Sequence, residues 1–426
     1  VELALRPPRA GGFSAATLIA YFEHRDEERR ELPMPWRGLE GDRDVFAVTL
    51  ETGDYVGLVW YSFRLEGLDG RREELGPFQL TVYDGAEEVP AWFGEGVTYQ
   101  IFPDRFRRTR VPDPTGMVGG RSVHTGWEEE PVYRPDRNGE VRNRDFFGGA
   151  DSIIRRWLAA GADGWRLDVA DELPDDFIHG IHAAARQAKP EAVIIGEVWE
   201  DGSNKIAYGV RRRHILGGHC DGLMNYPFRN ALLSFLLGED AFRFRQAMET
   251  LRENYPRFAF YSAMNALGTH DTPRILTLLG VGNECQDRSR EWRSSFRMDP
   301  DQRRRGKELL KLGAALLFAF PGSPTVYYGD EAGMEGFEDP FNRRPYPWGR
   351  EDGELLGWFK QLGALRKDHP ALRRGTIRYV AAEGPLLAFA RADDGEELLC
   401  VCYAGDAPVT LPLPGKTASP LAGTPA

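Results

Sequence analysis

The pattern of apolar and polar positions changes twice along the chain. Up to about residue 94, short segments rich in β-branched and aromatic residues are bounded by turn residues, which predicts a β-sandwich. These segments lie at residues 45–50, 56–65 and 78–83. After residue 373 the chain is again β-rich, at residues 377–380, 386–390 and 398–403. We therefore predict three domains: an N-terminal β-sandwich (1–94), a central domain (95–372) and a small C-terminal β domain with a tail (373–426).

The central domain alternates short apolar runs with amphipathic segments of helical period, which predicts βα units and a parallel barrel. The predicted strands lie at residues 97–102, 164–169, 192–198, 221–225, 263–268 and 325–331. The predicted helices lie at residues 152–160, 175–188, 228–237, 241–254, 306–318 and 354–367. An eight-stranded barrel needs about 250 residues, a length that this domain has. Only six strands are found, because residues 103–150 are irregular and rich in Pro, Gly and Arg.

Three of the predicted strands end at a carboxylate. Asp168 lies in GWRLDVADE (164–172), Glu197 in IGEVW (195–199) and Asp271 in LGTHDTPR (267–274). In a parallel barrel the C-terminal strand ends surround one mouth, and catalytic groups lie there. An acid-rich cleft suits glycoside hydrolysis, in which one carboxylate attacks the sugar and a protonated one assists the leaving group.

The neighbours of these carboxylates fit the same chemistry. Arg166 is two positions before Asp168, so both side chains share one face of a strand, and a guanidinium there keeps a carboxylate ionised. Glu197 has little basic sequence nearby, and an apolar setting favours the protonated form that an acid catalyst needs. Arg-x-Asp alone is most often a structural ion pair; the three motifs together favour catalysis.

Other charged positions are interpreted as structural. Asp171 and Glu172 follow a strand end, which is typical of caps or surface acids. The basic runs at residues 211–214 and 303–305 are interpreted as solvated helix surface.

Composition excludes several classes of protein. A net charge of −11 argues against a nucleic-acid partner, whose phosphates require a basic face. No apolar run of 18 residues exists, so we predict no membrane span. Residues 1–10 lack the basic start and apolar stretch of a signal peptide. The four cysteines are too few for a disulfide scaffold and lack zinc-site spacing. We predict a cytoplasmic protein.

At these motifs the chain resembles the alpha-amylase superfamily of glycoside hydrolases, and among them the neopullulanase/cyclomaltodextrinase-like members, over roughly residues 96–372. Further segments carry the resemblance in the same order. They are YQIFPDRF (99–106), FFGG (146–149), MNYPF (224–228), GSPTVYYGDE (322–331) and NRRPYPW (342–348).

The resemblance implies a retaining glycoside hydrolase that cleaves α-1,4-glucosidic bonds in maltooligosaccharides, cyclodextrins or related α-glucan oligosaccharides. It implies that Asp168 is the nucleophile that forms a covalent glycosyl-enzyme intermediate. Glu197 is then the general acid and afterwards the general base. Asp271 is expected to hold the 2- and 3-hydroxyls of the sugar.

The resemblance also implies a wider substrate-binding set around the catalytic carboxylates. Arg166 accompanies the nucleophile, and His270 matches a histidine that hydrogen-bonds the sugar. Asp339 and Arg343, four residues apart, match a pair that orients the glucose on the non-reducing side. Relatives often form a homodimer through the N-terminal domain, so a homodimer of this chain through residues 1–94 is a possible partner arrangement.

The chain also departs from the family pattern. The second and third barrel strands, and an Asn-His motif after the third, are missing between residues 149 and 152. We therefore predict an incomplete TIM-type (β/α)8 barrel of about six strands. Three explanations stay open: a recorded sequence that omits residues, a deletion in the gene, or a non-catalytic glucan-binding relative. A transglycosylase or isomerase with the same catalytic trio is a further alternative.

We predict no cofactor and no metal. Some relatives bind calcium with residues after the first strand and directly after the Phe-Gly-Gly motif. In this chain those places hold residues 107–110, three of them arginine, and Ala150. Arginine cannot ligate a hard cation such as calcium.

Overall fold

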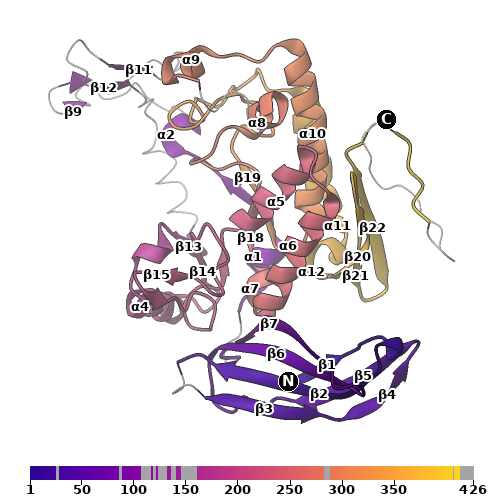
Figure 1. The fold of residues 1–426 in the computed structure, drawn as a ribbon. Coiled ribbons are helices and arrows are strands. Elements are labelled where there is room, and N and C mark those ends of the chain that lie inside the picture. The colour runs from indigo at the N-terminus through magenta and orange to yellow at the C-terminus, as the bar shows by residue number, and fades with distance from the viewer. Residues whose placement is uncertain are drawn as a thin grey trace.

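The computed structural model describes most of the chain (Figure 1). The described residues are 1–24, 28–85, 89–106, 117–118, 121–122, 132–135, 141–144, 161–282, 288–405 and 407–412. The predicted helix at 152–160, the motif at 146–149 and the junction at 150–151 lie outside these residues.

The N-terminal region forms two antiparallel sheets, drawn in indigo in Figure 1. Its strands are β1 (Glu2–Leu5), β2 (Phe13–Phe22), β3 (Arg29–Met34), β4 (Trp36–Glu40), β5 (Arg43–Thr49), β6 (Gly57–Gly67) and β7 (Arg72–Val82), with a 3-10 turn η1 (Arg9–Gly11). The sheet orders are β1-β5-β4 and β3-β2-β6-β7, and both sheets contribute to one core. The sequence predicted β5, β6 and β7. It missed β1, β2, β3 and β4. Of these, β3 and β4 are edge strands that carry charged residues, as edge strands often do, whereas β2 is a central strand of its sheet.

Six parallel strands form the centre of the molecule, and each matches a strand predicted from the sequence. They are β8 (Thr98–Gln100), β13 (Gly164–Leu167), β14 (Val193–Gly196), β17 (Gly222–Leu223), β18 (Met264–Ala266) and β19 (Ser323–Tyr327). Two sheets, β13-β14-β17 and β18-β19-β8, are joined by a parallel bridge between Met224 and Met264. The resulting order places β13 and β8 at opposite ends. Within the part of the chain that the structure describes, each of these end strands pairs with one neighbour.

Helices connect and cover these strands. They are α1 (Trp92–Glu95), α2 (Pro103–Phe106), α4 (Asp175–Ala188), α5 (Tyr226–Leu236), α6 (Ala241–Asn254), α7 (Arg257–Tyr261), α8 (Ile275–Val281), α9 (Arg290–Ser295), α10 (Pro300–Ala319), α11 (Gly353–Asp368) and α12 (Pro370–Arg374). The prediction began α10 six residues too late. The helix begins at Pro300 because Asp299 and Gln302 form a capping box, which satisfies backbone N–H groups of the first turn. No described helix is long and apolar enough to cross a membrane.

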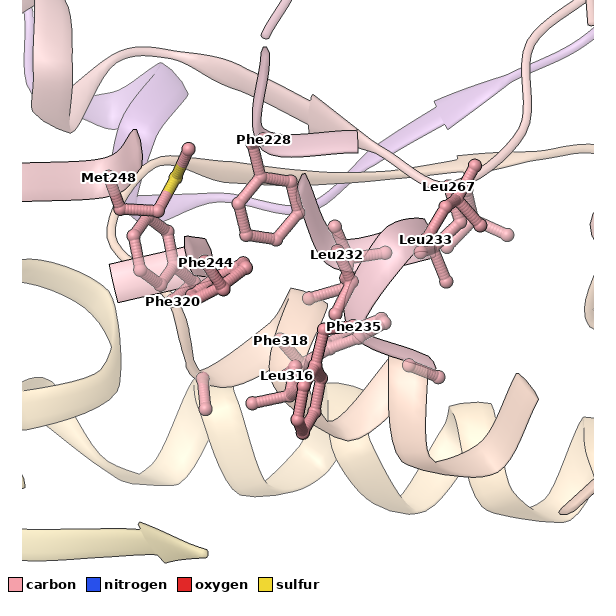
Figure 2. Packing of buried hydrophobic residues seen from close by; sticks show 14 of the residues in the cluster. Phe228, Leu232, Leu233, Phe235, Phe244, Met248, Leu267, Leu316, Phe318 and Phe320 are labelled. Atoms are coloured by element: carbon pink, nitrogen blue, oxygen red, sulfur yellow. The ribbon is translucent and has the colours of Figure 1, made fainter. Parts of the chain in front are cut away.

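A single large core joins α5, α6 and α10 beneath the strands (Figure 2). Phe228 and Phe244 lie against Phe320, with ring centroids 4.9 and 5.8 Å apart. Arg366 of α11 lies at the edge of this core and donates to four backbone carbonyls, those of Gly94, Phe318, Gly322 and Leu372. These bonds connect α1, the end of α10, the start of β19 and α12. They therefore hold the strand ends opposite the site in place.

The remaining sheets are small. β20 (Thr376–Glu383), β21 (Leu386–Asp393) and β22 (Glu396–Tyr403) form an antiparallel C-terminal sheet, and each contains one of the three β-rich segments predicted after residue 373. Leu387 and Phe389 of this sheet belong to the same core as α10. Two-stranded ladders are formed by β9 (Met117–Val118) with β10 (Arg121–Ser122), by β11 (Val132–Pro135) with β12 (Val141–Arg144), and by β15 (Ile206–Ala207) with β16 (Val210–Arg211).

The interpretation of residues 211–214 as solvated helix surface was wrong. Arg211 ends strand β16. Arg212 and His214 are buried, with 6% and 0% of their surface exposed. Their side chains reach the residues that follow β13, so the run is part of the structure around the site.

Candidate active site

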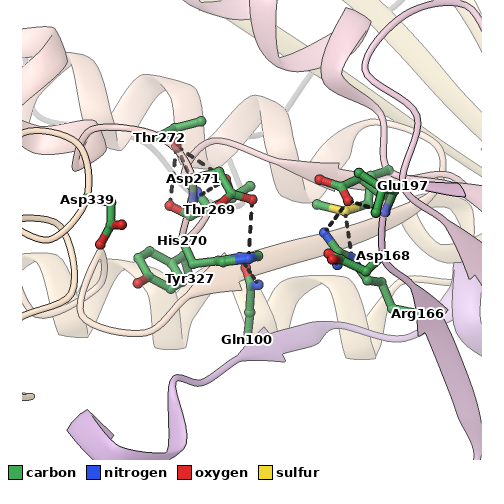
Figure 3. Close-up of polar contacts among 12 residues, drawn as sticks. Gln100, Arg166, Asp168, Glu197, Thr269, His270, Asp271, Thr272, Tyr327 and Asp339 are labelled. Carbon is green, nitrogen blue, oxygen red and sulfur yellow. Dashed lines mark hydrogen bonds and ion pairs between the residues drawn. The ribbon is translucent and has the colours of Figure 1, made fainter. Parts of the chain in front are cut away.

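The predicted carboxylates lie at the C-terminal ends of parallel strands. β13 ends at Leu167 and is followed by Asp168, and β14 ends at Gly196 and is followed by Glu197. Asp271 lies in the turn that follows β18. Figure 3 shows Arg166, Asp168 and Glu197 in one group, and Gln100, His270 and Asp271 in a second. Because the strands are parallel, both groups lie on the same rim of the sheet.

Arg166 links the two carboxylates of the first group. Its Nη1 donates to Asp168 Oδ1, and its Nη2 forms an ion pair with Glu197 Oε2 at 3.1 Å. Its Nε points to Met224 Sδ at 3.3 Å. The hydrogen bond from Arg166 holds the pKa of Asp168 below its ordinary value, although burial acts in the opposite direction. An ionised Asp168 that is mostly exposed to solvent has the chemistry of a nucleophile.

Glu197 is buried, but its setting is polar. Oε2 accepts a hydrogen bond from the backbone N–H of Val169 at 2.7 Å, and Oε1 accepts one from Trp199 Nε1 at 3.2 Å. With Arg166 beside it, the predicted apolar setting was wrong. The arginine comes from the neighbouring strand, so the sequence around Glu197 does not reveal it. Both oxygens of Glu197 are held in fixed directions by these partners.

His270 and Asp271 form the second group. His270 Nε2 lies 3.2 Å from Asp271 Oδ2, and His270 Nδ1 lies 3.0 Å from Gln100 Nε2. Burial lowers the pKa of His270; Asp271 opposes this, while the charges of Arg166 and Arg343 add to it. The positive charges of Arg166 and Arg343 thus both disfavour protonation of His270.

Arg343 joins Asp271 to Asp339, the residue with which the resemblance pairs it. Its Nη2 lies 3.3 Å from Asp271 Oδ1, and its Nη1 lies 3.1 Å from Asp339 Oδ1. Its Nε donates to the backbone carbonyl of His270 at 3.0 Å. All seven site residues predicted from the sequence thus lie on this rim, in two groups.

Sequence reasoning missed Asn342 as a supporting residue. Asn342 is fully buried, and its Nδ2 donates to the carbonyls of His270 and Thr272 at 2.8 and 2.7 Å. These bonds fix the turn that carries Asp271. The signal was present, because Asn342 opens the NRRPYPW segment that was singled out for its resemblance.

A cavity of about 640 Å³ opens beside Asp271 and Trp199. It is also lined by Arg229, Asn230 and Thr272, so its wall mixes polar and apolar groups. Trp199 is half-exposed and stacks on buried Tyr226, with ring centroids 4.0 Å apart and planes inclined by 9°. This stacking presents the other face of the indole to solvent as a rigid apolar surface. The sequence analysis did not assign either ring to the site.

No metal centre can be built from the described part of the chain. There, no group of three or more His, Cys, Asp or Glu side chains is arranged to hold a metal ion. The positions considered for calcium, residues 107–110 and Ala150, lie outside the described residues. The absence of a metal therefore stays a prediction.

Residues 137–352, about half of the chain, match the alpha amylase catalytic domain. The chain therefore belongs to the alpha-amylase family. The catalytic domain of this family is a TIM barrel, which agrees with the parallel strand order described above.

Comparison with individual proteins gives the same family. The chain is 35% identical over 288 residues to an amylopullulanase of Thermoanaerobacter thermohydrosulfuricus, covering 62% of this chain and 18% of that protein. It is 34% identical over 320 residues to a cyclomaltodextrinase of Bacillus sp, covering 73% of this chain and 51% of that protein. The chain thus spans at most about half the length of these two relatives.

A solved structure extends the similarity of fold beyond the central domain. The type III pullulan hydrolase from Thermococcus kodakarensis superposes with a TM-score of 0.58 over 95% of this chain and 91% of that one. At 19% identity this likeness concerns the fold alone.

Proposed function

We propose that this chain is a retaining glycoside hydrolase that cleaves α-1,4-glucosidic bonds in maltooligosaccharides, cyclodextrins or related α-glucans. The observation that carries the proposal is the pair of carboxylates, Asp168 and Glu197, linked by Arg166 at the ends of adjacent parallel strands. Membership of the alpha-amylase family, and relatives named as an amylopullulanase and a cyclomaltodextrinase, support this substrate class.

In the proposed reaction Asp168 attacks the anomeric carbon and forms a bond to it, while Glu197 gives its proton to the departing glycosidic oxygen. In the second half Glu197 takes a proton from water, and the resulting hydroxyl displaces Asp168 with overall retention. The lowered pKa of Asp168 supports the first role, because a nucleophile must be ionised. The hydrogen bonds to both oxygens of Glu197 support the second, because they fix the direction of proton transfer.

The second group is proposed to bind the sugar at the cleavage point. Asp271 is held by His270 and Arg343, so its oxygens are oriented for sugar hydroxyls. Asp339, paired with Arg343, extends this polar surface. Trp199 lines the same cavity as Asp271, and its exposed face offers an apolar surface suited to a pyranose ring.

The test is to replace each proposed catalytic carboxylate by its amide. Asp168→Asn and Glu197→Gln should each lower the release of reducing ends from maltotriose, cyclodextrin and pullulan by at least about a thousandfold. Asp163→Asn is the matched control, since Asp163 is an exposed acid at the opposite end of β13 that pairs with Lys189. Proton NMR of the first product should show the α-anomer. Full activity in both amide variants would contradict the assignment.

The same assay separates the alternatives. Binding of maltotriose without any release of reducing ends by the unmodified protein would favour a non-catalytic glucan-binding protein. Oligomers longer than maltotriose would favour a transglycosylase, and an isomeric disaccharide would favour an isomerase.

We further propose that residues 95–372 form an incomplete barrel, flanked by a β-sandwich domain (1–94) and a C-terminal β domain (373–426). The exposure of large rings on the two end strands supports this, at 42% for Tyr99 on β8 and 58% for Trp165 on β13. Such positions are covered in a closed barrel. Peptide mapping across residues 148–156 of the protein made from its native gene tests the proposal, because additional peptides there would supply the missing strands. A cytoplasmic location and dimerisation through residues 1–94 stay predictions.

A further inference from the structure

The backbone directly after Asp168 adopts an unusual conformation. Val169 has φ 41° and ψ 54°, in the left-handed region. This region is unfavourable for β-branched residues, and such outliers persist only where the surroundings enforce them. Val169 is half-exposed, so core packing does not account for its conformation.

The conformation of Val169 has a direct consequence for Glu197. The Val169 N–H donates to Glu197 Oε2 at 2.7 Å, and the next N–H, that of Ala170, donates to the Glu197 carbonyl at 3.1 Å. Two consecutive N–H groups thus point at the same residue. In an ordinary strand successive N–H groups point in opposite directions, so this arrangement depends on the left-handed residue.

The residues that follow Val169 are fixed by the segment that follows β14. Asp171, in the 3-10 turn η2 (Ala170–Glu172), is the centre of this contact. Its Oδ1 accepts from His214 Nε2 at 2.9 Å, and its Oδ2 lies 3.3 Å from Lys205 Nζ. Arg212 Nη1 donates to the backbone carbonyl of Asp171 at 3.0 Å. We call His214, Lys205, Arg212 and Asp171 the clamp.

A tyrosine of a hairpin loop belongs to the same contact. Tyr208 has φ 52° and lies between Lys205 and Arg212, in the turn between β15 and β16. Its hydroxyl donates to Glu172 Oε2, so both sides of the contact include a left-handed residue. The conformation of Tyr208 follows from the two-residue loop that it forms with Gly209 (φ 76°), because such hairpin loops favour positive φ at both positions. Val169 lies in no such loop, so its conformation needs another cause.

We propose that Asp171 is a positioning residue, which acts with the rest of the clamp to hold Val169 in the left-handed conformation, so that its N–H stays on Glu197. This inference rests on the proposed function, because it names what fixes the proposed acid. The clamp joins the segment after the proposed nucleophile to the segment after the proposed acid. It therefore couples the orientation of the two carboxylates.

A double-mutant cycle tests the proposal on the full chain. Asp171→Ala should lower kcat on maltotriose at least about tenfold, because a small misplacement of a catalytic group is costly. KM should change less than about twofold, since the sugar-binding group is untouched. Asp171→Asn keeps an acceptor for His214, so it should lower kcat less than Asp171→Ala does. Glu200→Gln is the matched control, because Glu200 contacts the same Lys205 without touching Asp171.

Val169→Gly completes the cycle. Glycine adopts the left-handed conformation without a steric penalty, so in the V169G background Asp171→Ala should cost at least about threefold less in kcat. V169G should also lower the midpoint of thermal unfolding less than Val401→Gly, a change at an equally exposed valine in regular strand β22. Equal losses of kcat in both backgrounds would overturn the proposal.

The unfolding midpoints of the same four proteins distinguish failure of this proposal from failure of the proposed function. Non-additive midpoints for positions 169 and 171 support the clamp, even if the unmodified protein hydrolyses no glucan. Additive midpoints overturn it, even if the protein is an active hydrolase. Absence of hydrolysis by the unmodified protein would count against the proposed function alone.

Discussion

Two arginine–aspartate pairs stand at the same rim of the parallel strands, and they differ in burial. In the Arg166–Asp168 pair the side chains are 25% and 74% exposed, whereas in the Arg274–Asp330 pair they are 0% and 4% exposed. At the exposed pair the arginine dominates and lowers the pKa of the aspartate. At the buried pair desolvation dominates and raises the pKa of Asp330 to about 6, against the opposing charge of Arg274.

The difference shows that the same two residue types have a structural role in one pair and a reactive role in the other. Asp330 is enclosed by its surroundings, and Arg274 also donates to the carbonyl of Tyr328 and lies over the rings of Tyr327 and Tyr328. This pair fixes the end of β19. Asp168 instead faces solvent, where a substrate can reach it. Burial, rather than the presence of an arginine, separates a structural pair from one that can react.

The largest effect is expected at the buried pair. Arg274→Met leaves Asp330 buried without its cation and should lower the free energy of unfolding by about 3–5 kcal/mol. Chemical denaturation measures this loss. The double variant R274M/D330N should regain part of it, because removing both partners leaves no unpaired buried charge. A double variant less stable than R274M would contradict the interpretation of this pair.

The loss in R274M should also depend on pH. Without Arg274 the pKa of Asp330 rises further above the value of about 3.9 expected in an unfolded chain. A group that binds its proton more tightly in the folded state reduces stability as the pH rises through this range. The loss should therefore be smaller at pH 4 than at pH 7, and the opposite order would show that burial does not control Asp330.

At the exposed pair we expect a loss of activity with a smaller loss of stability than at the buried pair. Arg166→Met should lower kcat by about a hundredfold, since it removes fixed positive charge from the reacting carboxylates. The free energy of unfolding should fall less than in R274M, because Asp168 stays exposed to solvent, although R166M also leaves buried Glu197 without its cation. Without its hydrogen bond the pKa of Asp168 rises, so the acidic limb of kcat/KM should move to higher pH. An unmoved acidic limb would show that Arg166 does not control Asp168.

The smallest effect is expected beside the exposed pair, at Trp199. Trp199→Phe keeps a stacking ring but removes the Nε1 donor to Glu197, so kcat should fall by only a few-fold, about the worth of one hydrogen bond. Trp199→Ala also removes the apolar face and should raise KM by about tenfold. Initial rates over a range of maltotriose concentrations measure both. A KM of W199A equal to that of W199F would show that the indole does not contribute to substrate binding.

The same comparison explains what the sequence could predict. The positions of Asp168, Glu197 and Asp271 follow from local information, because each lies directly after a short apolar run in a chain of βα units. The parallel strands were predicted for the same reason. Long-range partners could not be predicted in this way. The polar setting of Glu197, the burial of His214 and the role of Asn342 depend on residues from other strands and turns.

Two errors have simple local causes. The start of α10 at Pro300 was signalled by Asp299 and Gln302, but the predicted helix began at residue 306. The cluster at residues 303–305 was interpreted as solvated helix surface, which is correct for Arg304 and Arg305 but wrong for Arg303. Arg303 in fact pairs with Glu335 and Asp352 at 2.6 and 3.2 Å. Basic runs carry no periodicity of their own, so the sequence does not distinguish a solvated arginine from one that meets a distant acid.

Direct trapping of the glycosyl-enzyme intermediate is the measurement that tests the central claim. The protein would be incubated with a 5-fluoro-α-glucosyl fluoride, which forms the intermediate faster than it is hydrolysed, and then digested and mapped by mass spectrometry. Our account predicts one added glycosyl group, on the peptide that contains Asp168. Its accumulation should rise in E197Q, because fluoride leaves without a proton from Glu197, whereas water needs Glu197 as the base to hydrolyse the intermediate. A glycosyl group on another carboxylate, or continued hydrolysis of maltotriose without any adduct, would contradict the account.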